Sequence, residues 1–126
     1  MIKFRSLNKN REFLKVLKKK KINTKYFTVY FDKNSENFNN DFNKYLNISF
    51  VMRKNIGIAV TRNRIKRKLK YAVQKISKEK KIIDLSYTYV IFGKNNVYND
   101  KFSLVLNEMN EMFNKINKWE TKHEAN

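Results

Sequence analysis

The chain has 126 residues, of which 41% are hydrophobic, and 29 Lys and Arg against 11 acids give it a formal net charge of +18. This length suits one globular domain, expected to span residues 1–126 with an ordered core from about 4 to 118. The charge excludes an ordinary neutral metabolic enzyme as the default and indicates a polyanionic partner, while the absence of Cys excludes disulfides and thiolate chemistry.

The first expected element is a helix from Asn8 to Leu17, with Asn10 as its cap. Its apolar positions share one face because they follow the i, i+3, i+4 spacing: Phe13, Val16 and Leu17. The lysine run from Lys18 to Lys21 is expected to end this helix. Two interpretations of the run stay open, a solvated surface and a part of the basic binding surface.

Strands are expected in the next part of the chain. Alternating side chains predict one strand from Tyr26 to Phe31 and a second from Tyr45 to Met52, with an Asn-rich loop from Asp32 to Asn43 between them. The segment Gly57–Val60 is a candidate for a short third strand, so two or three strands are expected before the next helix.

A long helix is expected from Thr61 or Arg62 to about Lys78. Its apolar positions form a single stripe: Ile65, Leu69, Ala72, Val73 and Ile76. A strand from Ser86 to Phe92, broken by Gly93, follows this helix.

Asn99 or Asp100 is expected to cap a last helix, and the tail from Thr121 is expected to fray. The apolar stripe of this helix is expected to face the core: Phe102, Leu106, Met109, Phe113 and Ile116. The order of helix, two or three strands, helix, strand and helix predicts an α+β fold with a partly parallel, mixed sheet.

The segment from Arg53 to Lys81 is the most informative, because it holds twelve basic residues and one acid, Glu79. Solvated helix faces normally carry acidic residues among the basic ones, but no acidic residue occurs from Arg53 to Ser77. This absence favours phosphate binding over a merely solvated surface. A helical wheel places one set of polar residues on each flank, with Arg67 between them: Arg62, Asn63, Lys66 and Lys70 on one side, and Arg64, Lys68, Tyr71 and Lys75 on the other. A membrane-surface helix is disfavoured, since the apolar stripe is needed for the core and lacks Trp and Phe.

A second surface is predicted where Phe13 and Leu17 meet Thr28 and Tyr30, forming a groove on which bases of a single strand stack. The alternative is that Phe13 and Leu17 only pack the first helix on the sheet. No cluster of side chains has catalytic or metal-ligand spacing, and His123, the one His of the sequence, lies in the tail.

The run Arg62-Asn63-Arg64-Ile65-Lys66-Arg67, preceded by a K-x-x-G-x-A-V pattern from Lys54 to Val60, resembles the signature of the bacterial ribonuclease P protein component. The resemblance extends roughly from Phe4 to Lys118. It implies a two-layer α/β sandwich in the order α-β-β-β-α-β-α, with a mixed four-stranded sheet and a left-handed β-α-β crossover, whereas the general rule for such units is right-handed.

The resemblance also implies a function. The protein would be the accessory subunit of an endoribonuclease in the cytoplasm, whose catalytic RNA, holding most of the Mg²⁺, removes the 5′ leader of precursor tRNA. No residue of the protein would be catalytic or ligate a metal, and no membrane and no obligate protein partner are expected. The implied RNA-binding residues are Arg53, Lys54, Arg62, Asn63, Arg64, Lys66, Arg67, Lys68 and Lys70. The implied leader-binding cleft consists of Phe13, Leu17, Thr28, Tyr30, Arg62, Asn63, Lys66 and Lys70, although Leu17 stands where the family often has an aromatic residue.

Two alternatives come from other classes of protein. A structural ribosomal protein that binds rRNA would have the same charge and fold class, and only the signature run separates it from the first interpretation. An architectural DNA-binding protein is disfavoured, because no recognition-helix pair with a short turn is visible.

Overall fold

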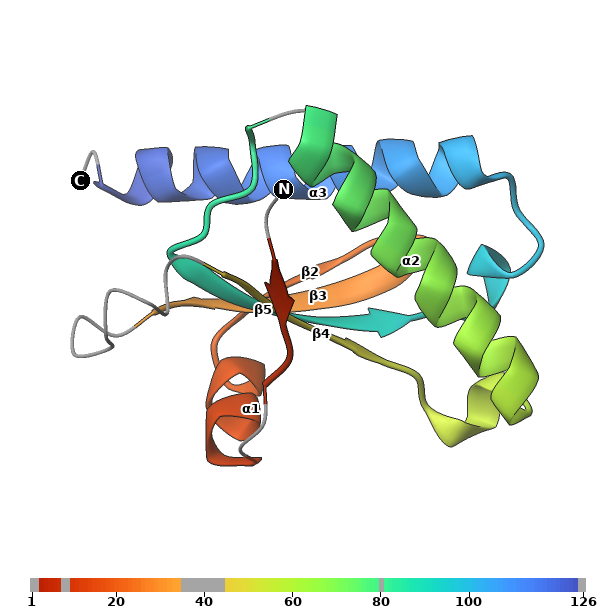
Figure 1. Ribbon diagram of the computed structural model, residues 1–126. Coiled ribbons are helices and arrows are strands. Elements are labelled where there is room, and N and C mark those ends of the chain that lie inside the picture. Colours follow the sequence, from red (N-terminus) through yellow and green to blue (C-terminus); the bar gives the residue numbers. More distant parts are fainter. Residues whose placement is uncertain (1–2, 8–9, 35–44, 80, 125–126) are drawn as a thin grey trace.

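The computed structural model describes residues 3–7, 10–34, 45–79 and 81–124, which form one sheet and three α-helices (Figure 1). In chain order the elements are β1 (Phe4–Arg5), α1 (Asn10–Leu17), β2 (Lys20–Asn23), β3 (Phe27–Lys33), β4 (Leu46–Val51), α2 (Ala59–Glu79), β5 (Tyr87–Gly93) and α3 (Phe102–Glu124). Two 3-10 turns precede the long helices, η2 (Lys54–Ile56) before α2 and η3 (Asn95–Val97) before α3.

The sheet has the strand order β1-β4-β5-β3-β2. β3 pairs antiparallel with both β2 and β5, whereas β4 pairs parallel with both β1 and β5. A parallel pair of strands needs a crossover connection, and α2 is that connection between β4 and β5. The mixed α+β sandwich predicted from the sequence is therefore confirmed, with the expected order of elements from α1 to α3.

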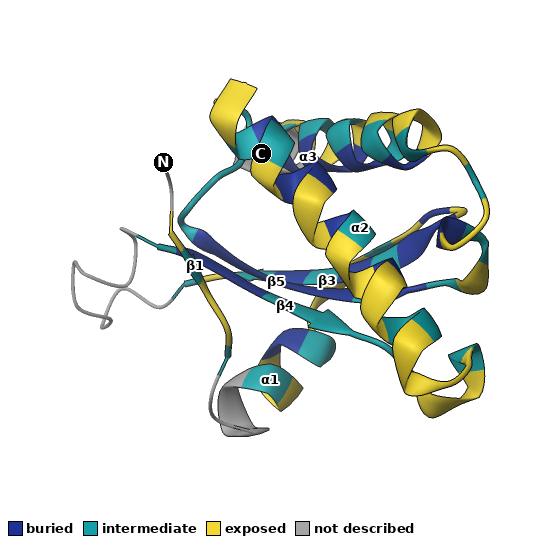
Figure 2. Ribbon diagram, turned by 45° about the vertical axis from the view of Figure 1, so that its right-hand side comes forward, coloured by how far each residue is buried: buried dark blue, intermediate teal, exposed yellow. Residues whose placement is uncertain are grey.

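The main core lies between the sheet and the layer formed by α2 and α3, while α1 lies on the opposite face (Figure 1). All five residues of the predicted α2 stripe are buried, and the exposed residues of α2 form a continuous band that faces away from the sheet (Figure 2). On α3, Met109, Phe113 and Ile116 are buried as predicted, whereas Phe102 and Leu106 are half-buried against the core. The 3.6-residue period thus identified the buried faces of both long helices.

The predicted strand at Gly57–Val60 is wrong. Gly57 has a φ of 148°, a conformation that favours glycine, and α2 begins two residues later at Ala59. Ile58 and Val60 are 72% and 58% exposed, so neither side chain joins the core. An apolar run of this length does not distinguish a strand from the first turn of a helix, which explains the error.

The described residues form a sheet of five strands rather than the four that were predicted. The predicted strand at Gly57–Val60 is absent, and β1 beside β4 and β2 beside β3 are two strands that were not predicted from the residues. The first helix ends at Leu17, directly before the lysine run, as predicted, and Lys20 and Lys21 are exposed. They lie in β2, which was not predicted and in which only Ile22 is half-buried. Charged residues on an edge strand limit its pairing with other chains. Because β2 consists mostly of such exposed polar residues, it lacks the apolar alternation by which a strand is predicted from a sequence.

Smaller differences concern the ends of elements. Gly93 is the last residue of β5 rather than a break after it, and α3 continues to Glu124, past the predicted start of fraying at Thr121. β3 includes Asp32 and Lys33, and the rest of the predicted loop lies almost entirely outside the described residues. The start of the first helix at Asn8 and the side chains of Asn10 and His123 also lie outside them.

Candidate nucleic-acid interface

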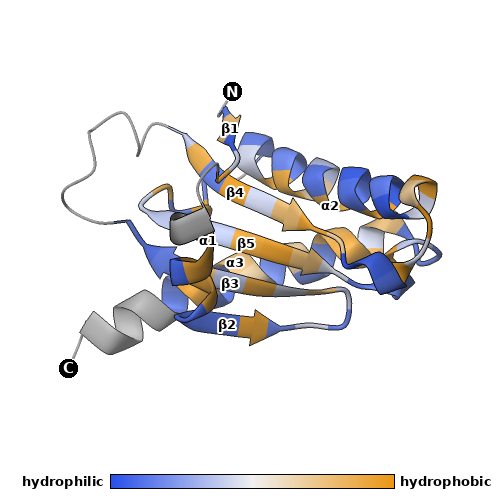
Figure 3. Ribbon diagram, turned by 90° about the horizontal axis from the view of Figure 1, so that it is seen from below, coloured by the Kyte–Doolittle hydropathy of each residue, from blue (hydrophilic) through white to orange (hydrophobic). Residues whose placement is uncertain are grey.

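The sheet face opposite the main core is only partly covered. Thr28 and Tyr30 alternate along β3 with core-facing residues, so both side chains lie on this open face. Figure 3 views the face directly: α1 lies across one end of the strands and leaves the carboxyl ends of β4 and β5 uncovered. This part of the face carries Thr28 and Tyr30, two residues of the predicted groove, and it is called the sheet groove below.

α1 forms one wall of the sheet groove. It contacts β3 and β5, and among its described side chains Val16 is buried while Phe13 and Leu17 are half-buried. Phe13 and Leu17 therefore pack partly against neighbouring residues and keep part of their surface exposed. The buried part of both side chains agrees with the packing interpretation, and a role in lining the groove stays a prediction.

An aromatic platform that the sequence did not reveal lies beside Thr28. Phe92 on β5 is the register partner of Thr28, and its ring meets the ring of Tyr30 in an edge contact with the centroids 5.5 Å apart. The guanidinium carbon of Arg53 lies 5.4 Å from the centroid of the Phe92 ring. This distance is within the range of a cation–π contact, so Arg53, predicted to bind RNA, is held over Phe92.

A pocket of about 270 Å³ opens at this platform. Its walls come from the ends of β3 and β5 and from the two 3-10 turns and their flanks: Thr28, Arg53, Asn55, Ile56, Phe92, Gly93, Lys94 and Asn95. None of these lining residues is acidic. The ammonium of Lys94 donates to the side-chain oxygen of Asn23 at 2.6 Å and to the carbonyl of Thr24 at 2.5 Å, which fixes this charge at one wall.

The first flank of α2 is largely solvated. Asn63, Lys66 and Lys70 are exposed, and Arg62 is half-buried, with an Nε atom that is buried and has no hydrogen-bond partner among the residues that the structure describes. Arg67 is exposed as well. The helix carries no acid before Glu79, which pairs with Lys75 at 3.5 Å. Most of this helix therefore presents unneutralised positive charge.

The predicted cleft residues do not all meet at one place. Thr28 and Tyr30 lie on the sheet face that carries α1, whereas α2 packs on the opposite face with α3. η2 connects the two surfaces, because residues of this turn line the pocket and α2 begins three residues after it. Among the predicted cleft residues of α2, Arg62 and Asn63 are thus nearest along the helix to the end that follows η2, and Lys70 lies about 12 Å beyond Arg62 at 1.5 Å per residue.

The second flank of α2 joins the loop between β5 and α3. Arg64 donates to the hydroxyl of Tyr98 at 3.2 Å, and its guanidinium carbon lies 6.0 Å from the centre of that ring. The ammonium of Lys68 donates to the carbonyls of Val97, at 2.7 Å, and Asp100. Lys68, predicted to face RNA, therefore holds this loop against the helix.

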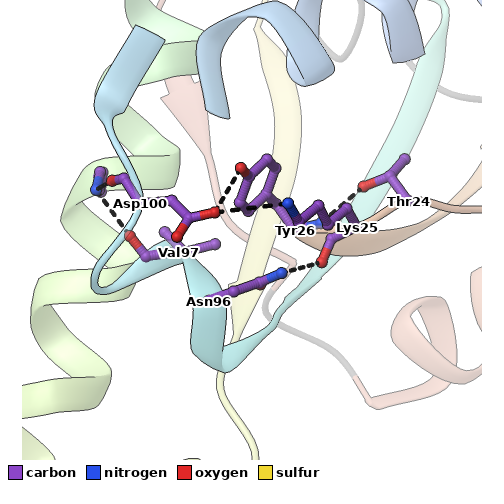
Figure 4. A network of polar contacts seen from close by, with 7 residues as sticks. Thr24, Lys25, Tyr26, Asn96, Val97 and Asp100 are labelled. Atoms are coloured by element: carbon purple, nitrogen blue, oxygen red, sulfur yellow. Dashed lines mark hydrogen bonds and ion pairs between the residues drawn. The ribbon is translucent and has the colours of Figure 1, made fainter. Parts of the chain in front are cut away.

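A polar network extends from this loop to the turn between β2 and β3 (Figure 4). The hydroxyl of Tyr26 donates to the Asp100 carboxylate at 2.7 Å, and Asn96 donates to the carbonyl of Lys25 at 2.8 Å. The hydrogen bond to Asp100 is the largest cause that raises the pKa of Tyr26 to about 12, and burial and the charges of Asp100 and Glu108 add to it. Tyr26 thus stays neutral at physiological pH and acts as a hydrogen-bond donor.

The described part of the chain contains no group of three or more His, Cys, Asp or Glu side chains that could hold a metal ion. None of its helices is long and apolar enough to cross a bilayer.

Comparisons with known proteins agree with the fold and with the signature run. The family model described as Ribonuclease P matches residues 1–117. The ribonuclease P protein component of Carboxydothermus hydrogenoformans is 34% identical over 110 residues, which cover 86% of this chain and 88% of that protein. The protein of the same name from Mesoplasma florum is 28% identical over 107 residues, covering 84% of this chain and 89% of the relative.

Solved structures of similar proteins have the same fold. The RNase P protein from Thermotoga maritima superposes with a TM-score of 0.68 at 21% identity, covering 88% of this chain and 96% of that one. The RNase P protein of Staphylococcus aureus gives a TM-score of 0.63 at 22% identity, covering 90% of this chain and 94% of that one. The family match and the 34% identical relative confirm the resemblance of the Arg62–Arg67 run and disfavour the ribosomal alternative. The chain therefore belongs to the ribonuclease P protein family, the protein subunits of the ribonucleoprotein endoribonuclease ribonuclease P.

Proposed function

We propose that the chain binds the catalytic RNA of ribonuclease P through α2 and holds the 5′ leader of precursor tRNA over the sheet groove. The RNA, with Mg²⁺, cleaves the leader to give the mature 5′ end of the tRNA. The observation that carries this proposal is the exposed face of α2, which has no acid from Ala59 to Lys78 in a chain of this family. Such a face is costly in the free protein and is stabilised when it meets phosphates.

Electrostatics supports a role in assembly. The chain carries a formal net charge of +18, and each phosphate that it neutralises releases condensed counterions from the RNA. A protein of this charge lowers the repulsion between the catalytic RNA and the precursor tRNA, so both can approach closely. We expect the assembly to weaken steeply as salt is added, because the affinity then comes mainly from phosphate contacts.

The sheet groove supports a role in substrate binding. Tyr30 and Phe92 form an aromatic surface, and Arg53 and Lys94 place two positive charges beside it. Aromatic surfaces with basic walls bind single-stranded nucleic acid, since every base has a face that can stack. The 5′ leader of precursor tRNA is single-stranded, so it fits this groove better than a duplex does.

The proposal assigns the Mg²⁺ to the RNA, because this hard cation prefers oxygen ligands and is commonly held through phosphates. The protein residues bind, position and screen charge.

A reconstitution assay tests the proposal. The purified chain is mixed with a bacterial ribonuclease P RNA and a 5′-labelled precursor tRNA at low Mg²⁺, and each component is omitted in turn. We expect cleavage at the mature 5′ end that requires the RNA and is enhanced by the chain. Tight RNA binding without enhancement would contradict the subunit role, and cleavage by the chain alone would contradict the assignment of catalysis to the RNA.

A further inference from the structure

We propose that two exposed tyrosine rings, at the seam between α2 and the start of α3, stack unpaired nucleotides of the catalytic RNA. The rings are those of Tyr71 on α2 and Tyr98 in the loop between β5 and α3, and together they are called the tyrosine surface below. The inference deepens the proposed function and rests on it, because the partner is the catalytic RNA. The RNA-binding residues implied by the family resemblance include neither tyrosine.

The two rings are accessible from solvent and lie away from the sheet groove. Tyr71 is 56% exposed and Tyr98 is 41% exposed. Tyr71 belongs to α2 and Tyr98 contacts that helix, so both are part of the helical layer (Figures 1 and 2). Thr28 and Tyr30 of the sheet groove lie on the other face of the sheet, so the tyrosine surface is a separate site.

The fold holds the Tyr98 ring in place. Arg64 donates to its hydroxyl at 3.2 Å, with the guanidinium carbon 6.0 Å from the centre of the ring. The backbone on both sides of Tyr98 is fixed as well, because Lys68 donates to the carbonyls of Val97 and Asp100. A base that stacks on this ring therefore costs little additional ordering of the protein.

The Tyr71 ring is held by a neighbouring aromatic residue. Tyr71 and Phe102, the first residue of α3, have ring centroids 5.1 Å apart and an angle of 49° between their planes. Phe102 packs against the core, so it anchors Tyr71 from one side. Tyr71 lies seven residues after Arg64, which is about 10 Å along the helix at 1.5 Å per residue, so the two rings offer places for two separate bases.

Positive charge accompanies the two rings. Arg67 is exposed, and it is a neighbour of both Arg64 and Tyr71 on the helix surface because it lies three residues after the first and four before the second. Lys101, directly before α3, is also exposed. Phosphates next to a stacked base would therefore meet a guanidinium or an ammonium, which supports binding of a polyanion.

Two acids occur close by in the sequence, and both are engaged elsewhere. The Asp100 carboxylate accepts the hydrogen bond from the hydroxyl of Tyr26, on the side of the loop that meets the turn between β2 and β3. Glu79 pairs with Lys75 at 3.5 Å, two turns of α2 beyond Tyr71. These contacts direct both carboxylates to other partners than the tyrosine surface.

The chemistry of the surface selects unpaired RNA. Unpaired bases stack on aromatic side chains, whereas a double-stranded helix is recognised mostly through its phosphates and 2′-hydroxyls and would leave the two rings unused. A second copy of the chain is disfavoured as the occupant, because two molecules that each carry a charge of +18 repel one another. The tyrosine surface continues the basic face of α2, so its nucleotides belong to the RNA that this face binds.

The first experiment measures binding of the full chain to a bacterial ribonuclease P RNA in the absence of tRNA. Tyr98→Leu and Tyr71→Leu each remove one ring and should weaken binding by about 5-fold or more, the effect of one lost base stack. Tyr98→Phe and Tyr71→Phe keep the ring and should bind like the natural protein. The slope of log affinity against log salt should stay the same in all four variants, because none of them removes a phosphate contact.

The chain offers a matched control in Tyr45→Leu. Arg5 lies over the Tyr45 ring at 5.3 Å, so this change breaks another pair of Arg and an aromatic ring, beside the first residue of β4 and outside the tyrosine surface. Tyr45→Leu should leave the affinity for the catalytic RNA unchanged, and an equal loss there would overturn the assignment. Circular dichroism checks that each variant folds.

The second experiment identifies the partner and does not depend on a Leu variant that folds. Tyr98 is replaced by the photo-crosslinking amino acid p-benzoylphenylalanine in the complex of the chain, the catalytic RNA and precursor tRNA, and the crosslinked nucleotides are mapped by primer extension. We expect crosslinks to unpaired nucleotides of the catalytic RNA, with or without a 5′ leader on the tRNA. Crosslinks only to paired nucleotides, only to the tRNA, or none above background would contradict the proposal.

The outcomes separate the tyrosine surface from the proposed function. If the natural protein binds the RNA and enhances cleavage, but both Leu variants bind as tightly, the tyrosine surface is wrong and the proposed function stands. Equal losses in the Leu and Phe variants would assign the effect to the hydroxyl groups and would also overturn the stacking. If the natural protein does not bind the catalytic RNA, the proposed function fails, and the tyrosine surface fails with it.

Discussion

Lys68 and Lys70 provide a matched test of how the basic helix works. Replacing either by Met removes one positive charge from α2 and keeps the aliphatic stem. Each change also removes one like-charge i, i+4 pair, with Arg64 for Lys68 and with Lys66 for Lys70. The two differ in their contacts: Lys68 holds the carbonyls of Val97 and Asp100, whereas Lys70 is exposed and has no hydrogen bond or ion pair to another described residue.

The contacts set the expected magnitudes. A hydrogen bond from a charged group contributes about 1.5–3 kcal/mol, and Lys68 makes two, but water can reach this half-buried site and replace part of them. We therefore expect Lys68→Met to lower the free energy of unfolding by about 2 kcal/mol, which corresponds to a fall in Tm of about 6–10 °C for a domain of this size. Lys70→Met should leave the stability unchanged or raise it by at most about 0.5 kcal/mol through the relief of repulsion.

The assay is thermal unfolding followed by circular dichroism at one ionic strength, combined with RNA binding over a range of salt. Lys70→Met should reduce the slope of log affinity against log salt by about 1, as the loss of one phosphate contact does. Lys68→Met should reduce that slope less, because its ammonium is already bound within the fold. Equal Tm values for the two variants, together with equal losses of slope, would refute the structural role of Lys68.

Three further predictions concern the groove and the polar network. Tyr30→Ala should weaken binding of leader-bearing precursor by about 5-fold or more, the effect of one lost base stack, and leave mature tRNA unaffected; equal losses for both substrates in a binding titration would contradict the groove. The hydrogen bond to Asp100 raises the pKa of Tyr26 from 10.0 to about 12, so the folded state favours the neutral phenol. The contribution of this hydrogen bond to the stability of the protein is therefore complete below pH 10 and is lost as the pH rises toward 12. The difference in urea unfolding free energy between the natural protein and Tyr26→Phe should therefore shrink between pH 10 and 12. A difference that stays constant would exclude this hydrogen bond as the cause of the raised pKa. Gly93→Ala would place a Cβ 2.7 Å from the Met52 methyl group, so we expect the free energy of unfolding in urea to fall by about 1–3 kcal/mol. Met52→Ala should restore part of this stability, and an unchanged urea midpoint in Gly93→Ala would show that the neighbouring side chains move aside without cost.

The sequence predicted the parts of the fold that depend on long periodic patterns. The α2 and α3 stripes extend over several turns, so each buried residue supports the others in fixing the face that packs on the sheet. The basic face of α2 followed directly from that stripe, because the residues between the buried ones have to be exposed. The Arg62–Arg67 run indicated the protein family, which neither the composition nor the helical periodicity specifies.

Other features depend on pairings between distant segments, which a single sequence does not give. Lys20 and Lys21 lie in a strand only because Ile22 and its neighbours pair with β3 at the edge of the sheet. Phe92 belongs to a strand in which every residue but one is buried, so its composition does not show that it reaches the groove. The register that places it opposite Thr28 could have been inferred only by aligning the alternation of β3 with that of β5.

Lys68 shows a further limit of sequence reasoning. The residue lies on a basic helix between Arg67 and Leu69, and nothing in its local pattern distinguishes it from the exposed lysines. Its role depends on the carbonyls of a loop about thirty residues later in the chain. A basic residue on such a helix can therefore organise the binding surface without contacting the ligand.

The two sides of the sheet groove differ in how firmly the fold holds them. Among the described side chains of α1 only Val16 is buried, whereas α2 buries five, and the floor formed by β3 and β5 belongs to the main core. Local opening follows the amount of apolar surface that anchors a segment, so α1 separates from the sheet at a lower free energy than α2 or the strands do. If the groove binds RNA as proposed, the strand would lie on strands that the core holds firmly, beside a helix that can shift. Part of the binding free energy would then fix the position of α1, and sequence changes that anchor α1 more firmly would increase affinity without any new contact to RNA.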